Sequence, residues 1–179
     1  MNTKTKRISW STIFLNGMLC IVALFCAAVS VPAAGPGAST ASLSPSDDPI
    51  LLQELARVRR ATARYHDISQ AIADDYVDIG LFVSGQGFHY LKPTVLDGTF
   101  DLEKPEILVY APNPTGDRLR LVAVEYAVPV LLSPSAPEGF TGATDLWEVN
   151  TEFGLWVLHA WVWQANPNGM FADSNPRVP

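Results

Sequence analysis

Four ionisable residues in this sequence could do chemistry together, because each lies in a stretch with the alternating pattern of a β-strand. They are His89, Glu106, Glu125 and His159. Alternate side chains of a strand point to opposite faces of a sheet. His159 then shares its face with apolar residues, and Glu125 is flanked on its face by Ala123 and Ala127. Burying such groups costs free energy unless they find partners, so the pattern predicts that they meet in the folded protein.

The register of one hairpin decides which of these side chains meet. If residues of the strands 106–111 and 119–128 pair so that their numbers sum to about 231, Glu106 lies opposite Glu125 on the same face. His89, on a short strand at 88–91, would complete a cluster with His159. A slip of one residue would turn every side chain of a strand to the other face, so the cluster depends on this register.

The cluster supports three kinds of interpretation. Two imidazoles with one or two carboxylates could bind a divalent transition metal and leave coordination positions open. The same groups could serve as an acid and a base without a metal. The structural alternative is a hydrogen-bonded pair of His159 and Glu125 in the core, or Glu106 and Glu125 facing water. The sequence leaves these alternatives open.

Aromatic residues accompany these groups on the same predicted strands. Four of them could line a ligand pocket: Tyr90, Tyr110, Trp161 and Trp163. Packing in the core is the alternative, since buried Trp and Tyr side chains contribute large apolar areas to cores.

The elements that must position these residues are one helix and a series of strands. Apolar residues recur every three or four positions over residues 51–76, which predicts a long amphipathic helix. Asp48 is expected to cap its start, and fraying is expected after about Asp74. Strands are expected at 82–83, 88–91, 106–111, 119–128 and 154–164, with a long loop at 129–146.

This order of elements predicts the fold class. One long N-terminal helix followed by four or more antiparallel strands indicates an α+β fold, in which the helix packs on one face of a curved antiparallel sheet. A small closed β-barrel of the cupin-like kind is the alternative.

The first 34 residues predict a secretory signal peptide. Three basic residues near the start precede an apolar run at 13–28, and small residues at 33–35 fit a cleavage site. Residues 35–47 are rich in Gly, Ala, Ser and Pro, which indicates a flexible linker, and residues 48–179 are expected to form a single domain. We therefore expect an exported protein, secreted or periplasmic. The alternative is a chain anchored in the membrane by an uncleaved N-terminal segment.

Charge and missing motifs narrow the possible functions. The chain carries 12 Lys and Arg against 18 Asp and Glu, a formal charge of −6. Removal of the three basic residues of the predicted signal peptide leaves nine against 18, or −9, which repels nucleic acid phosphates. We therefore expect no nucleic acid partner. The sequence also lacks a phosphate-binding loop, a G-x-G-x-x-G motif and an H-E-x-x-H motif.

Five short motifs are distinctive. They are GFHY at 87–90, PEILVY at 105–110, LVAVEY at 121–126, LHAWVW at 158–163 and NPNGMFA at 166–172. Together they resemble a group of exported bacterial proteins that has no assigned activity, and the resemblance covers most of residues 61–178. It implies a bacterial exported domain and carries no catalytic residues with it.

Three functions remain open at this point. The first is an exported domain that binds a small molecule or a protein partner at the open face or end of its sheet. The second is a metal-dependent enzyme that uses His89, His159 and Glu125, with or without Glu106. The third is a structural or envelope-interaction protein that makes contact through the loop at 129–146 or through an exposed apolar patch.

Overall fold

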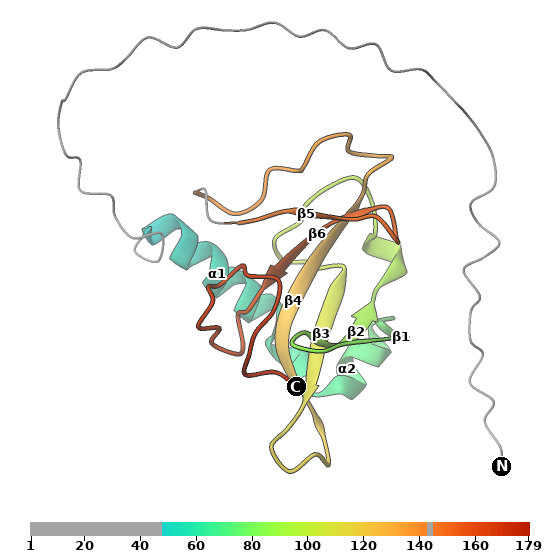
Figure 1. The fold of residues 1–179 in the computed structure, drawn as a ribbon, viewed down its shortest axis with the longest axis vertical. Helices are drawn as coiled ribbons and strands as arrows, with labels where there is room; N and C mark the ends of the chain where they lie inside the picture. Colours follow the sequence, from blue (N-terminus) through green and yellow to red (C-terminus); the bar gives the residue numbers. More distant parts are fainter. Residues whose placement is uncertain (1–47, 143–144) are drawn as a thin grey trace, which may run out of the picture. The chain divides into compact units, whose positions relative to one another are not determined.

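The computed structural model describes residues 48–142 and 145–179 of the 179-residue chain. The predicted signal peptide (1–34) and linker (35–47) lie outside the described residues. The described part begins with helices and continues as six strands in one antiparallel sheet (Figure 1). The predicted α+β fold is therefore confirmed. Among the described residues, no helix has the length and hydropathy that a membrane span requires.

Helix α1 (Pro49–Thr62) begins where the sequence predicts. The Asp48 carboxylate accepts a hydrogen bond from the Ile50 N–H at 2.8 Å, which satisfies one of the free donors of the first turn. The helix continues as a 3₁₀ turn, η3 (Ala63–His66). Its buried residues on one face, which include Leu55 and Val58, pack into the core against the sheet.

The predicted long helix is interrupted at Asp67. This residue has an extended backbone (φ −89°, ψ 105°), and its carboxylate accepts a hydrogen bond from the Ser69 N–H at 3.0 Å. It thereby caps a second helix, α2 (Ile68–Ala73), instead of continuing the first, so the expectation of one uninterrupted helix was wrong. The predicted end near Asp74 is confirmed, because Asp75 takes a left-handed conformation with φ 67°.

The six strands form an open sheet in the order β1-β2-β3-β4-β6-β5. Their bounds are β1 Val77–Val83, β2 Gly87–Leu91, β3 Ile107–Pro112, β4 Leu119–Pro129, β5 Glu148–Asn150 and β6 Leu155–Ala160, and a 3₁₀ turn, η4 (Pro93–Val95), follows β2. β1 and β5 are the two edge strands, so the sheet does not close on itself. It is strongly curled and has the form of a half-barrel. The alternative of a closed barrel was wrong.

Three strands differ from the sequence prediction. β1 begins at Val77, directly after the stretch expected to be helical, and Gly80 lies within it. β5 was not predicted, because three residues are too few for a period to be recognised. β6 ends at Ala160 although the apolar run continues to Trp163.

The register between β3 and β4 changes at a β-bulge. Near the turn Tyr110 pairs with Leu121, and there the residue numbers sum to 231 as expected. One residue further Val109 pairs with Ala123, so Val122 is an extra residue in β4. A bulge of this kind bends the strand and increases its twist. Beyond it, Ile107 rather than Glu106 pairs with Glu125.

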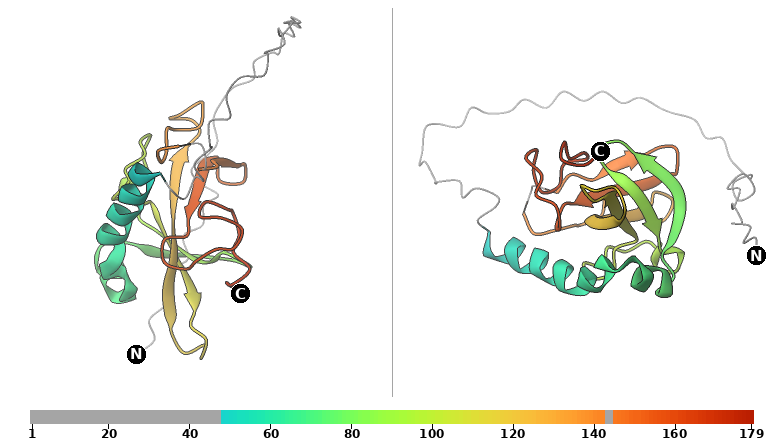
Figure 2. Two further views of the ribbon diagram at one scale, coloured as in Figure 1. Left: turned by 90° about the vertical axis from the view of Figure 1, so that its left-hand side faces the viewer. Right: turned by 90° about the horizontal axis from the view of Figure 1, so that it is seen from below.

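The sheet separates two apolar clusters. The helices cover one face, where α1 packs against residues such as Leu108, Tyr110 and Tyr126. The other face carries a smaller cluster in which several positions are alanine, including Ala123 and Ala127. The last residues of the chain lie on this second side, opposite α1 (Figure 2, left).

Gly87 at the start of β2 lies close to the backbone of the neighbouring strand β3. It has φ 119°, and a Cβ there would press on the carbonyl group of Tyr110. We predict that Gly87→Ala lowers the free energy of unfolding by roughly 2–4 kcal/mol, measured by urea denaturation.

Gly80→Ala is the matched control for this prediction. Gly80 also has positive φ (70°), but apart from its two neighbours in the chain no described residue has an atom within 4 Å of the position that an added methyl group would occupy. We expect this substitution to cost about 1 kcal/mol, which is the backbone contribution alone. Equal losses in the two variants would contradict the packing argument.

Candidate metal centre

Glu125 lies at the middle of the candidate site, on the face of the sheet opposite α1. It is directly opposite Ile107 of β3 and His159 of β6. Directly opposed residues of antiparallel strands have their side chains on the same face, with Cβ atoms about 5 Å apart. The alternation of β4 and β6 therefore brings Glu125 and His159 together.

His89 joins this pair from a more distant strand. It pairs with Val109, so β3 lies between His89 and Glu125. In a flat sheet, β2 and β6 would be about 14 Å apart, since adjacent strands are separated by about 4.8 Å. The imidazole centroids of His89 and His159 are nevertheless only 6.1 Å apart. The curl of the sheet toward this face makes the three side chains converge.

The three side chains form a compact and buried group. His89, Glu125 and His159 each offer one donor atom, and these atoms all lie within 4.8 Å of one another. Oε2 of Glu125 is 3.4 Å from Nε2 of His89 and 3.8 Å from Nε2 of His159. The residues are 2%, 6% and 4% exposed in chain order. Nitrogen and oxygen donors in this arrangement could hold a metal ion.

Hydrogen bonds do not explain this convergence. Oε2 of Glu125 and Nε2 of His159 are buried and have no hydrogen-bond partner among the described residues. The alternative of a hydrogen-bonded Glu125–His159 pair is therefore not what the structure contains. A buried polar atom without a partner costs about 1–3 kcal/mol, and such atoms mark places where an ion or water completes the site.

Burial keeps all three groups uncharged at neutral pH when no ion is bound. Desolvation raises the pKa of Glu125 to about 8, and the carboxylates of Asp173 and Glu106 add to this increase. Desolvation lowers the pKa of His159 to about 3, helped by the nearby His89. It also lowers the pKa of His89. Both imidazoles are therefore neutral, which is the form that binds metals.

The outward nitrogens of the two imidazoles face acceptors. Nδ1 of His89 is 3.4 Å from the carbonyl oxygen of Leu81 in β1. Because a carbonyl only accepts, Nδ1 carries the proton and Nε2 presents its lone pair toward Glu125. Nδ1 of His159 is 3.9 Å from the carboxylate of Asp173. The His159 ring also stacks on Trp161, with an interplanar angle of 13°.

Glu106 does not join the cluster, so the prediction that it lies opposite Glu125 was wrong. The bulge at Val122 turns Glu125 to the face opposite α1. Glu106 keeps the alternation of β3 and stays, with Leu108 and Tyr110, on the face that α1 covers. There Glu106 is 1% exposed, and its carboxylate accepts a hydrogen bond from the Ala127 N–H at 3.0 Å. Glu106 thus satisfies a backbone donor of β4 just before β3 begins.

The four candidate pocket aromatics do not line a common pocket. Tyr90 and Tyr110 pack edge to face in the core beneath α1, and the Tyr110 hydroxyl donates to the carbonyl of Tyr65 at 2.7 Å. Trp163 packs against the ring of His66 on that same side. Trp161 alone of the four lies beside the cluster, where it stacks on His159.

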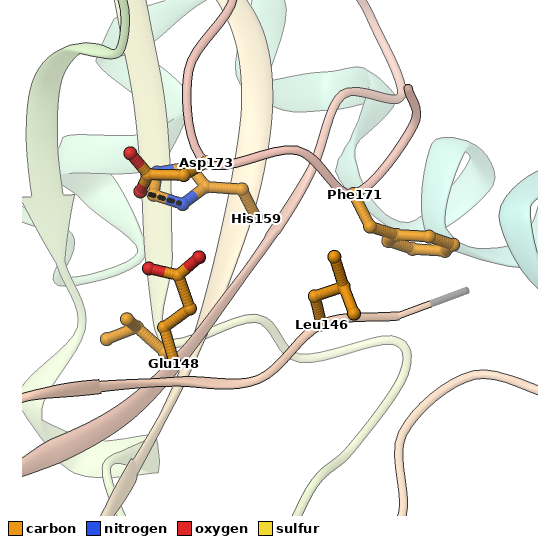
Figure 3. Close-up of a pocket in the computed structure, with 6 residues that line it drawn as sticks. Leu146, Glu148, His159, Phe171 and Asp173 are labelled. Atoms are coloured by element: carbon orange, nitrogen blue, oxygen red, sulfur yellow. Dashed lines mark ion pairs between the residues drawn. The ribbon is translucent and has the colours of Figure 1, made fainter. Parts of the chain in front are cut away.

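A small pocket opens beside His159, with a volume of about 10 Å³. This is close to the smallest volume that holds one water molecule. Its lining residues are Leu146, Glu148, Val157, His159, Phe171 and Asp173. Figure 3 shows the carboxylates of Glu148 and Asp173 beside the imidazole, with Leu146 and Phe171 on the other side. Of the three cluster residues, His159 is the one that lines this pocket.

The sequence interpretation missed the residues around the cluster. Asp173 lies in a stretch without periodic pattern, and Leu81 contributes a backbone atom, so neither gives a signal in the sequence. Glu148 belongs to the unpredicted strand β5. A single acid in so short a strand cannot be told from an ordinary surface acid by its sequence.

No protein-family model, curated protein or solved structure matches this chain. The resemblance to exported bacterial proteins therefore stays a prediction, and the site is interpreted from its own geometry.

Glu106 makes stability depend on pH. Burial raises its pKa to about 8 from the ordinary 4.5, so above pH 4.5 the unfolded chain loses this proton before the folded chain does. Stability therefore falls as pH rises from about 4.5 to 8, by about 1.4 kcal/mol for each pH unit between the two pKa values. Glu106→Gln cannot ionise and keeps an acceptor for Ala127.

We predict that between about pH 5 and pH 8 the free energy of unfolding of the wild type falls by up to roughly 4 kcal/mol more than that of Glu106→Gln. The measurement is urea unfolding in the presence of chelator, so that metal binding does not contribute. Glu125 titrates in both proteins, and because Glu106 is the smallest of the three causes that raise the pKa of Glu125, most of its contribution cancels in the comparison. Parallel pH profiles for the two proteins would contradict the buried, protonated state of Glu106.

Proposed function

We propose that this chain is an exported metal-binding protein that holds a divalent transition metal ion through His89, Glu125 and His159. The observation that carries the proposal is the pair of unpartnered buried atoms, Oε2 of Glu125 and Nε2 of His159, which face each other beside Nε2 of His89.

The spacing of the donor atoms supports an ion between them. Two ligands at about 2.1 Å from a tetrahedral ion lie about 3.4 Å from each other. The separations of 3.4 Å and 3.8 Å from Glu125 to the two histidines are close to that value. They are longer than the roughly 2.7–3.2 Å of ordinary hydrogen bonds. Small rotations of the side chains would bring all three donors to coordination distance.

The donor types support a transition metal. Two neutral imidazoles and one carboxylate suit zinc and its neighbours in the first transition row, whereas calcium and magnesium prefer sites made of oxygen. Three protein ligands leave at least one coordination position for water or another small ligand. When bound, the ion would supply Lewis acidity and a coordinated water at that position.

The geometry favours binding over metal-dependent catalysis. The three donors are at most 6% exposed, and the pocket beside His159 has a volume of about 10 Å³. Enzyme pockets for small molecules are typically about 300–1,000 Å³. The proposal thus takes the His/Glu metal site from the second of the three functions that the sequence left open, without its catalytic activity.

The interaction role of the loop stays a separate prediction. Leu131 and Leu132 in this loop are 83% and 62% exposed, which is the observation that favours it. Scattered exposed leucines are common on protein surfaces, so this observation carries less weight than the buried cluster.

We predict that the domain binds one Zn²⁺ per chain, measured by elemental analysis and by titration against a chromophoric chelator. Metal at about 100 times Kd adds about 2.7 kcal/mol of stability, which corresponds to a rise in melting temperature of roughly 10 °C for a domain of this size. His159→Ala and Glu125→Gln should each abolish this rise. Gln has the shape of the uncharged Glu side chain. We therefore expect Glu125→Gln to fold even if His159→Ala does not.

The chain offers a matched control for each variant. His66 is exposed and lies against Trp163 on the other side of the sheet, and Glu106 is as buried as Glu125 but points to the other face. His66→Ala and Glu106→Gln should keep full zinc binding. Absence of stoichiometric metal after loading with zinc, cobalt, nickel and manganese would overturn the proposal, as would equal losses in the control variants.

A further inference from the structure

The second ring nitrogens of the two imidazoles face different kinds of group. The backbone carbonyl of Leu81 faces Nδ1 of His89, and that carbonyl is fixed by the strand. The corresponding acceptor for Nδ1 of His159 is a side chain, Asp173, whose Oδ1 lies 3.9 Å away. Histidines that bind metals almost always donate their second ring N–H to a carboxylate, a carbonyl or a water, which fixes the tautomer and the ring orientation.

Asp173 is held in place from two sides. The side-chain amide of Gln86 donates a hydrogen bond to the same Oδ1 at 2.8 Å. The neighbouring backbone is tied to the turn between β1 and β2, because Asn175 N–H donates to the Gly85 carbonyl at 2.8 Å and Gly85 N–H donates to the Pro179 carbonyl at 2.9 Å. These hydrogen bonds keep the carboxylate near His159, with room to rotate, since it is about half exposed.

A second set of contacts fixes the ring of His159 relative to this segment. Trp161, which stacks on His159, donates its indole N–H to the Ala172 carbonyl at 2.6 Å, and its backbone N–H donates to the Met170 carbonyl at 2.9 Å. One face of the His159 ring therefore packs on the Trp161 indole, which is hydrogen-bonded to Ala172, the residue next to Asp173. A modest rotation of the Asp173 side chain would shorten the 3.9 Å separation to a hydrogen bond.

We propose that Asp173, held by Gln86, is a positioning residue that keeps the proton of His159 on Nδ1 and its Nε2 lone pair directed at the metal. This inference rests on the proposed function and extends the site to the C-terminal segment. Asp173 does not touch the ion; it acts through His159.

The test is the zinc affinity of four proteins, measured by competition with a chromophoric chelator: the wild type, Asp173→Ala, Asp173→Asn and Glu148→Gln. Removal of the group that accepts a hydrogen bond from a metal-binding histidine typically weakens metal affinity about 10- to 100-fold. We expect a loss of that size for Asp173→Ala. Asp173→Asn keeps an acceptor oxygen without the charge, and we expect an intermediate loss. Glu148→Gln removes the same charge from the same pocket, and we expect less than about a threefold change.

A second readout separates positioning from a general loss of structure. Nitrogen chemical shifts of the His159 ring in the metal-free proteins report which nitrogen carries the proton. We expect the Nδ1–H tautomer in the wild type and a change toward Nε2–H in Asp173→Ala, with the His89 ring unchanged.

The possible outcomes are distinguishable. A wild type that binds no zinc overturns the proposed function and this inference with it. A wild type that binds zinc with the same affinity as both Asp173 variants overturns the positioning role alone. Equal weakening of zinc binding in Asp173→Ala and Glu148→Gln also overturns it, because the two acids would then act only through their negative charge near the ion. Weakening confined to the Asp173 variants, with the change of tautomer, supports it.

Discussion

The extra residue in β4, Val122, determines which side chains face one another across the sheet. Without it the pairing near the turn would continue, and Glu106 would lie opposite Glu125. With it, Glu106 stays on the helix-covered face and satisfies the Ala127 N–H, while Glu125 turns to the opposite face and meets His159. A bulge also adds local twist, and the curl of the sheet brings His89 close to His159, with ring centroids 6.1 Å apart. One backbone irregularity therefore assigns two buried glutamates to different roles.

The face of the sheet opposite α1 buries three polar side chains, His89, Glu125 and His159, and brings their donor atoms together. Three titratable groups lie among apolar residues, and desolvation holds each in its uncharged form, with the pKa of Glu125 raised to about 8 and that of His159 lowered to about 3. Unpartnered buried atoms of this kind destabilise a fold. Ala123 and Ala127, which flank Glu125 on this face, are small and fully buried. An ion bound there would offset the cost of burial, which is the physical reason to expect one.

The sequence predicts local features well and long-range ones poorly. The Asp48 cap and the positions of β2, β3 and β4 follow from local patterns, and so does the common face of His159 and Trp161. Glu125 was wrongly placed opposite Glu106 because alternation predicts faces only up to a bulge, and nothing in the run LVAVEY indicates one. The contact of His89 with Glu125 depends on curl, which no strand pattern encodes. Asp173 comes from a C-terminal segment without periodicity, so its approach to His159 required the tertiary structure.

The measurement that tests the metal site most directly is a crystal structure of residues 48–179 grown with Zn²⁺, with anomalous data collected on both sides of the zinc absorption edge. We expect one strong anomalous peak per chain, about 2.0–2.2 Å from donor atoms of His89, Glu125 and His159. Glu106 should remain on the opposite face of the sheet, bonded to Ala127. A structure without a peak among these three side chains, or with zinc held elsewhere by Glu106, would contradict the proposed site.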